Sequence, residues 1–143
     1  QVRYLKIYII YHNMSELEIL NQFKKSLISF LDEIISQFPT EEDIVFFRIV
    51  VNDKIPEISL MNEFILKILP HKDMITNRNE DFFINYNSEE IKNSSYHLKF
   101  ENIKSIWRSP YLDKYDKDII WQWFNTFVII SESYQNALLT NIN

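Results

Sequence analysis

Residues 15–39 read SELEILNQFKKSLISFLDEIISQFP, and this stretch gives the strongest indication of the fold. Ser15 and Glu18 form a capping box, in which the serine oxygen accepts from an amide of the first turn and the glutamate reaches back. Pro39 marks the end of the predicted helix. Apolar residues recur between these limits at spacings of three and four, which is typical of one stripe along an amphipathic helix. The stripe consists of Leu17, Leu20, Phe23, Leu27, Phe30, Leu31, Ile34, Ile35 and Phe38.

A second helix is predicted over residues 117–139, and its apolar residues lie almost all round it. Because a helix that is apolar on every side is normally buried on every side, we expect this one to be the central element of the fold. The alternative is that one of its faces docks on another chain. Asp113 to Asp116 supply its N-terminal cap, and residues 140–143 are expected to fray. Its apolar residues are Ile119, Ile120, Trp121, Trp123, Phe124, Phe127, Val128, Ile129, Ile130, Tyr134 and Leu138.

Weaker helical patterns occupy the middle of the chain. Thr40 opens T-E-E-D, which predicts an N-cap followed by three acids in the first turn of a helix. Residues 44–51 are β-branched and also fit a short strand, but the cap favours helix. Residues 56–70 form another apolar stripe, with Pro56 at the first helical position. A further helix is predicted from Ser88, as its N-cap, to about Trp107.

Two segments do not follow a helical pattern throughout. Residues 1–12 alternate only in part and fit a strand or a helix, with helix favoured because no clear partner strand follows. Residues 71–88 are rich in Asn, Asp and Lys and predict an ordered loop, with a short extended or helical piece around Glu80–Ile84. The whole pattern predicts one all-α domain, residues 1–143, built as a bundle of about five or six helices around a buried C-terminal helix.

The chain contains no glycine and no cysteine. These absences exclude glycine-rich phosphate loops, the G-x-S-x-G nucleophile elbow and thiolate metal or redox sites. They also disfavour hairpin-rich sheets, whose tight turns need residues with positive φ. Any left-handed helix C-cap is therefore expected to fall to asparagine. With one alanine against 23 isoleucines, the composition is also typical of an AT-rich genome.

The spacing of the reactive side chains indicates no catalytic or metal-binding site. His12, His71 and His97 have no second histidine or carboxylate at a metal-ligand spacing, so we expect no metal and no cofactor. The acidic clusters at residues 41–43 and 89–90 fall in first turns of predicted helices, where acids stabilise the helix dipole. We therefore expect that the protein is not an enzyme.

Aromatic and basic residues gather around the start of the C-terminal helix. Such interleaving is typical of single-strand nucleic-acid binding, but neighbouring acids bring the local charge close to neutral. Core packing is the expected role of the tryptophans, and any exposed part is expected to be a protein interface, where Trp, Tyr and Arg concentrate. The candidate interface residues are Trp107, Arg108, Tyr111, Tyr115, Trp121 and Trp123.

Parts of the sequence resemble helical proteins of unknown function from nucleocytoplasmic large DNA viruses. The likeness lies mainly in the C-terminal half, and the resemblance implies a viral, helical, non-enzymatic protein without catalytic residues to carry over. The segments concerned are FENIKSIWRS at 100–109, IIWQWFNTF at 119–127, NEFILKILP at 62–70 and EDFFI at 80–84.

These observations predict a non-enzymatic viral protein-interaction or structural module, with a protein partner or self-association. One alternative is a helical viral decoy of host cell-death or immune signalling, which binds a partner helix in a groove. Another is a nucleic-acid-associated accessory factor, which the net charge of −5 disfavours. No apolar run approaches the roughly 20 residues of a membrane span, so we expect a cytoplasmic protein, in the host cytoplasm or the virion if the source is viral.

Overall fold

A computed structural model gives the structure of the protein and describes residues 6, 10–11, 13–86 and 97–142. Every regular element in this part of the chain is a helix, so the all-α prediction is confirmed. The elements are α2 (Glu16–Gln37), α3 (Glu42–Lys54), α4 (Glu57–Lys67), the 3₁₀ helix η1 (Leu69–His71), α5 (Lys72–Thr76), α6 (Glu80–Ile84), α8 (His97–Trp107) and α9 (Lys114–Ile142).

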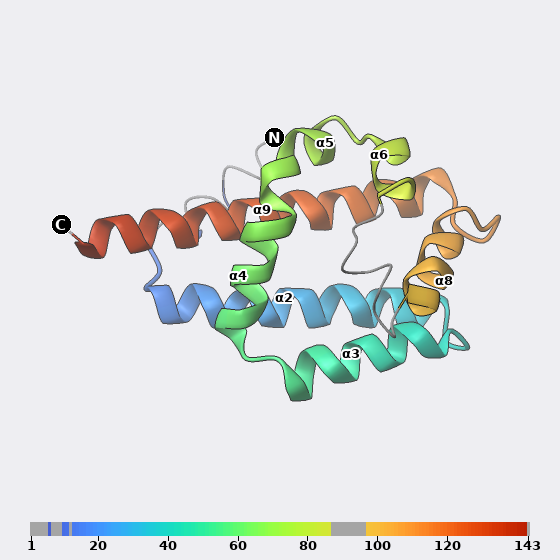
Figure 1. The fold of residues 1–143 in the computed structure, drawn as a ribbon, viewed down its shortest axis with the longest axis horizontal. Helices are drawn as coiled ribbons and strands as arrows, with labels where there is room; N and C mark the ends of the chain where they lie inside the picture. The colour runs from blue at the N-terminus through green and yellow to red at the C-terminus, as the bar shows by residue number, and fades with distance from the viewer. Residues whose placement is uncertain (1–5, 7–9, 12, 87–96, 143) are drawn as a thin grey trace.

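The two longest helices, α2 and α9, lie side by side and antiparallel at the centre of the bundle (Figure 1). The indole nitrogen of Trp123 donates to Glu33 at 2.8 Å, and the side-chain amide of Gln37 donates to Asp116 at 2.8 Å. The end of α2 therefore lies beside the start of α9. Between them runs the main core cluster, whose buried members are Tyr11, Ile19, Leu20, Phe23, Met61, Phe127, Ile130 and Tyr134.

The middle of α9 is buried or half-buried along its whole length. No residue from 116 to 134 is exposed, whereas Tyr115, Leu138 and Leu139 beyond this segment are. The other helices provide the cover: α2 along one side, α4 crossing both long helices, and α5 on a further face (Figure 1). The prediction of a buried C-terminal helix at the centre of the fold is confirmed.

Two serines in the enclosed part of α9 need hydrogen-bond partners, because an unpaired buried hydroxyl is costly. Ser131 and Ser133 are both buried. Their hydroxyls donate to the carbonyl oxygens of Val128 and Ile129, each at 2.8 Å, one turn earlier in the same helix. This local pairing lets a polar side chain lie in the core without a partner from another helix.

The remaining helices add two smaller clusters to the core. α3 packs along α2, and α8 packs against α3. Their shared cluster is centred on Leu31, Ile44, Val51 and Ile106. The third cluster joins α5 and α9 and is centred on Ile75, Trp121 and Val128.

Of the N-caps predicted at Ser15 and Thr40, the structure confirms the first and contradicts the second. Ser15 caps α2, since its hydroxyl oxygen accepts from the Glu18 amide at 3.2 Å and donates to the Glu18 carboxylate at 3.0 Å. Thr40 is not a cap: α3 begins after Glu41, and no side chain caps it. Residues 44–51 are nonetheless helical, as the favoured prediction held. This helix has no side-chain cap, but Ile44 and Val51 pack it against the core.

The loop predicted over residues 71–88 is wrong for its first part. The chain instead forms η1 and α5 there. The piece around Glu80–Ile84 is helical, which is one of the two forms predicted for it. Ile75 explains the difference, because it is buried against α9 and fixes a short helix in a polar stretch. Tertiary packing of this kind overrides local propensity.

Other helix boundaries differ by a few residues. Pro56 is the N-cap of α4 and lies one position before the helix. α9 begins three residues earlier than predicted and continues to Ile142, where a frayed end was expected. Residues 6, 10 and 11 are helical, but most of the 1–12 prediction and the start of a helix at Ser88 lie outside the described residues.

Candidate functional site

Three of the six candidate interface residues lie exposed at the turn between α8 and α9. Tyr111 is 79% exposed and Tyr115 is 72% exposed, and the Arg108 side chain is exposed as well. Lys114, at the first position of α9, is exposed too, as are Pro110 and the cap residue Asp113. We call four of these residues, Arg108, Tyr111, Lys114 and Tyr115, the junction surface.

Hydrogen bonds fix the backbone that carries the junction surface. The amides of Ser109 and Leu112 donate to the carbonyl oxygens of Ile106 and Ser109, at 3.0 and 3.1 Å. The Tyr111 amide donates to the Ser109 hydroxyl at 3.2 Å. Leu112 is buried and anchors the turn to the core between the two exposed tyrosines. The tyrosines therefore extend from an ordered turn, which lowers the entropy lost on binding.

Two aspartates cap the helix that begins at the junction. The Asp116 amide donates to Asp113 Oδ1 at 2.8 Å, and the Asp113 amide donates back to Asp116 Oδ2 at 3.1 Å. This reciprocal pair confirms the predicted cap. The Asp113 amide first, and then the Gln37 side chain, hold the pKa of Asp116 below its usual value. Both carboxylates thus serve the fold, since they satisfy amides that the helix leaves unpaired.

Trp107 and Trp121 pack together on the inner side of the junction. Trp121 is 5% exposed and belongs to the core, and its ring meets that of Trp107 edge to face, with centroids 5.5 Å apart. Trp107 is half-buried; its indole nitrogen donates to Glu80, and the Lys117 ammonium lies 5.0 Å from its ring centroid. Lys117, and to a lesser degree Trp107, lower the pKa of Glu80.

Trp123 lies on a different face of α9, against α2. It is half-buried beside Phe30, with ring centroids 5.9 Å apart, and it donates to Glu33. The structure therefore separates the three tryptophans from the exposed part of the candidate set. The sequence analysis did not single out Glu33 and Glu80, their partners. Because they lie 90 and 27 positions away along the chain, no local pattern could have shown them.

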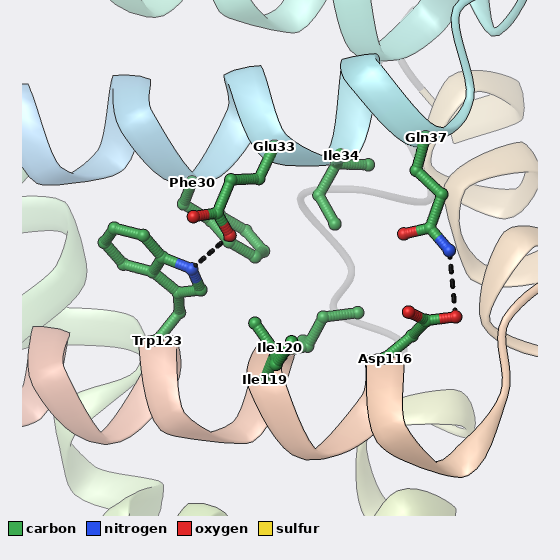
Figure 2. Close-up of a pocket in the computed structure, with 8 residues that line it drawn as sticks. All are labelled: Phe30, Glu33, Ile34, Gln37, Asp116, Ile119, Ile120 and Trp123. Carbon is green, nitrogen blue, oxygen red and sulfur yellow. Dashed lines mark hydrogen bonds between the residues drawn. The ribbon is translucent and has the colours of Figure 1, made fainter.

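Figure 2 shows a small pocket between α2 and α9, close to Trp123. Its volume is about 70 Å³. Pockets for small organic ligands usually measure about 300–1,000 Å³, so this one has room for water and little more. The hydrogen bonds from Trp123 and Gln37 cross it and join the two helices. The lining residues are Phe30, Glu33, Ile34, Gln37, Asp116, Ile119, Ile120 and Trp123.

A larger hollow of about 520 Å³ lies against the middle of α2. The residues that line it are polar or charged, apart from one isoleucine. The Lys24 ammonium within it donates to the carbonyl oxygen of Ile55 at 2.8 Å and lies 3.9 Å from Glu57. This lysine therefore ties α2 to the start of α4. The lining consists of Asn21, Lys24, Lys25, Ile28, Ser29, Asn52 and Glu57.

Among the described residues, no group of three or more His, Asp or Glu side chains is placed to hold a metal ion. His71 instead packs against Phe82 and Tyr86, with ring centroids 4.9 and 6.0 Å away. His12 and the side chain of His97 lie outside the described part of the structure. None of the helices described here has both the length and the apolar character needed to cross a membrane.

Comparisons with known proteins place no relative beside this chain. No family model, no curated protein and no solved structure matches it. Inference about function therefore depends on the chain's own residues, and chiefly on the junction surface.

Proposed function

We propose that the chain is a non-enzymatic protein-interaction module of viral origin, and that it binds its partner through the junction surface. The observation that carries the proposal is the exposure of Tyr111 and Tyr115 on a hydrogen-bonded turn. Tyrosine and arginine are enriched among the residues that dominate binding energy in protein interfaces. The viral origin rests on the resemblance of residues 100–127.

Tyrosine is well suited to such a surface. Its ring offers a large apolar contact area, while its two rotatable bonds keep the entropy lost on binding small. Leu112 holds the turn in place, so binding needs no rearrangement of the backbone. A second copy of the chain is one possible partner, and a different protein is the other.

The two alternative functions receive less support. A decoy that binds a partner helix needs an apolar groove, but the larger hollow has only one apolar residue in its lining and the pocket beside Trp123 measures about 70 Å³. A nucleic-acid-associated factor needs a basic surface, whereas the chain carries a net charge of −5.

The experiment that tests the proposal is site-specific photo-crosslinking in the native lysate. A photoreactive phenylalanine replaces Tyr111, captured proteins are identified, and the affinity of the purified partner is measured for the wild type and for Tyr111→Ala/Tyr115→Ala. We expect the double substitution to weaken binding by at least about tenfold, because truncating an interface hot-spot residue costs about 2 kcal/mol or more.

The matched control is Leu17→Ala/Leu139→Ala, which removes two other exposed apolar side chains at the opposite end of the molecule. It should leave the affinity unchanged. Equal affinity for the wild type and the tyrosine variant would contradict the proposal. So would a chain that captures no protein and stays monomeric at high concentration in sedimentation.

A further inference from the structure

The charges around the junction are balanced when they are read from the sequence. Between residues 108 and 118 the chain carries three basic and three acidic side chains. From the sequence alone, this segment has a net charge of zero, so no preference for an acidic or a basic partner is expected. The structure distributes these charges unequally between the fold and the surface.

All three acids have partners within the protein. Asp113 and Asp116 accept hydrogen bonds from amides at the start of α9. Asp118 pairs with Arg78 and accepts from Gln122 at 2.7 Å. Arg78 therefore offsets the charge of Asp118, whereas the charges of Asp113 and Asp116 are offset only in part, by the positive N-terminal end of α9.

The three basic residues differ in whether they form an ion pair. Lys117 pairs with Glu80 at 3.0 Å and lies over the Trp107 ring. Arg108 and Lys114 form none of the ion pairs found in the described part of the chain, and Lys114 acts on Asp118 only through space. Both side chains are exposed. Two cations without a salt-bridge partner thus lie in the same turn as Tyr111 and Tyr115.

We propose that the junction surface binds an acidic segment of a partner protein, an inference that rests on the proposed function. Arg108 and Lys114 face carboxylates of the partner, and the guanidinium of Arg108 can bind one of them through two parallel hydrogen bonds. Tyr111 and Tyr115 pack against the apolar parts of the same segment. Salt screens the interaction between exposed charges over about 10 Å at moderate ionic strength. The acidic residues elsewhere on the molecule, which give the chain its net charge of −5, therefore repel a short acidic segment at the junction only weakly.

An acidic protein segment fits better than a nucleic acid, which is also anionic. Nucleic-acid affinity comes from neutralising many phosphates, and the junction surface offers two cations, Arg108 and Lys114, that form no ion pair with the described residues. A long polyanion would also extend over the rest of an acidic molecule. An acidic segment of a few residues needs no more than the junction itself.

The test is a titration of the protein, followed by the amide NMR signals of residues 108–115, with three probes of equal length. The probes are a poly-glutamate peptide, a poly-lysine peptide and a dT oligonucleotide. We expect the poly-glutamate peptide to shift these signals and its affinity to fall as salt is added. Arg108→Glu/Lys114→Glu should lower that affinity by at least about tenfold.

The substitutions are chosen so that the fold survives them. Both side chains are exposed, and a glutamate at position 114 suits the first turn of α9. The matched control is Lys25→Glu/Lys54→Glu, which changes the net charge by the same amount at two exposed lysines on α2 and α3. It should retain binding of the poly-glutamate peptide.

Three results would overturn the inference: unchanged affinity in Arg108→Glu/Lys114→Glu, an equal loss in the Lys25/Lys54 control, or tighter binding of the oligonucleotide at the same residues. The crosslinked partner separates this inference from the proposed function. If only the tyrosine variant loses that partner, the acidic-segment inference fails and the proposed function stands. If neither variant loses it, the proposed function fails.

Discussion

Arg78 has a left-handed backbone, with φ of 51°, at the end of α5. The Asn79 amide donates to the carbonyl oxygen of Met74 at 2.9 Å, and the Arg78 amide donates to that of Ile75 at 3.1 Å. This is the Schellman arrangement, whose left-handed position glycine usually occupies. We predicted asparagine there, and that prediction is wrong. The ion pair of Arg78 with Asp118 on α9 gives arginine a role that asparagine is too short to fill.

The left-handed position yields a prediction about two substitutions. Arg78→Gly and Arg78→Ala both remove the ion pair with Asp118, but only alanine keeps the steric penalty of a Cβ atom at positive φ. We expect the alanine variant to be less stable than the glycine variant by about 1 kcal/mol, a difference that urea unfolding measures. An alanine variant as stable as the glycine variant would contradict the left-handed assignment.

Glu80 gives a second prediction at the residue scale, on how stability depends on pH. Lys117, and then Trp107, lower the pKa of Glu80 in the folded protein below the ordinary glutamate value of 4.5. A lowered folded-state pKa adds stability above the unfolded pKa, and this stability is lost as the pH falls through the folded value. The difference in unfolding free energy between the wild type and Glu80→Gln should therefore be largest near neutral pH and should shrink below pH 4.5. Urea unfolding measures the two free energies. A difference between them that stays constant from pH 7 to pH 3 would contradict the lowered pKa of Glu80.

At the scale of elements, the start of each helix shows which local signals act in the folded protein. Ser15 makes the capping hydrogen bond that its sequence predicts, and Thr40 makes none. Serine and threonine are both preferred N-cap residues, so the presence of a hydroxyl side chain does not by itself show which of the two caps a helix. In the structure α3 begins at Glu42 directly after Glu41, so Thr40 lies one position too early to cap it.

Ser15 and Thr40 form a matched pair of positions for mutation. Ser15→Ala should reduce the free energy of unfolding by about 1 kcal/mol, because it leaves an amide of the first turn of α2 without its side-chain acceptor. Thr40→Ala should change stability by less than about 0.5 kcal/mol, as is usual for exposed positions. Thermal unfolding monitored by circular dichroism measures both. Equal effects of the two substitutions would contradict the assigned caps.

At the scale of the whole molecule, α9 organises the bundle because α2, α4 and α5, from different parts of the chain, all pack against it. Its middle contacts α2 through the main cluster and α5 through the cluster of Trp121. Its two ends extend beyond that cover, so Tyr115 and Leu139 on the same helix are exposed. One helix thus supplies both the centre of the core and part of the junction surface.

This change of environment along α9 predicts unequal effects of similar substitutions. Ile130→Ala removes a fully buried side chain and should cost about 2–5 kcal/mol of stability, through lost burial and the cavity left behind. Leu139→Ala removes one that is 62% exposed and should cost less than about 0.5 kcal/mol. Urea unfolding at constant temperature compares them. Similar losses in both variants would show that the end of α9 is covered in solution.

The sequence by itself determined the fold class, the amphipathic helix α2 with its cap, and the central place of α9. These features follow from local quantities: the period of apolar residues, a capping box, and a helix that is apolar all round. It also determined that glycine-dependent and thiolate chemistries are excluded, since these need residues that the chain does not contain.

Only the tertiary structure decided which aromatic residues are exposed and which charges have partners. Trp121 and Tyr115 lie on one helix, and periodicity does not reveal that α5 covers the first and leaves the second exposed. Glu80 and Asp118 likewise pair with bases 37 and 40 positions away. Burial and ion pairing depend on segments distant in sequence that meet only when the chain folds, so the junction surface could be defined only in the folded molecule.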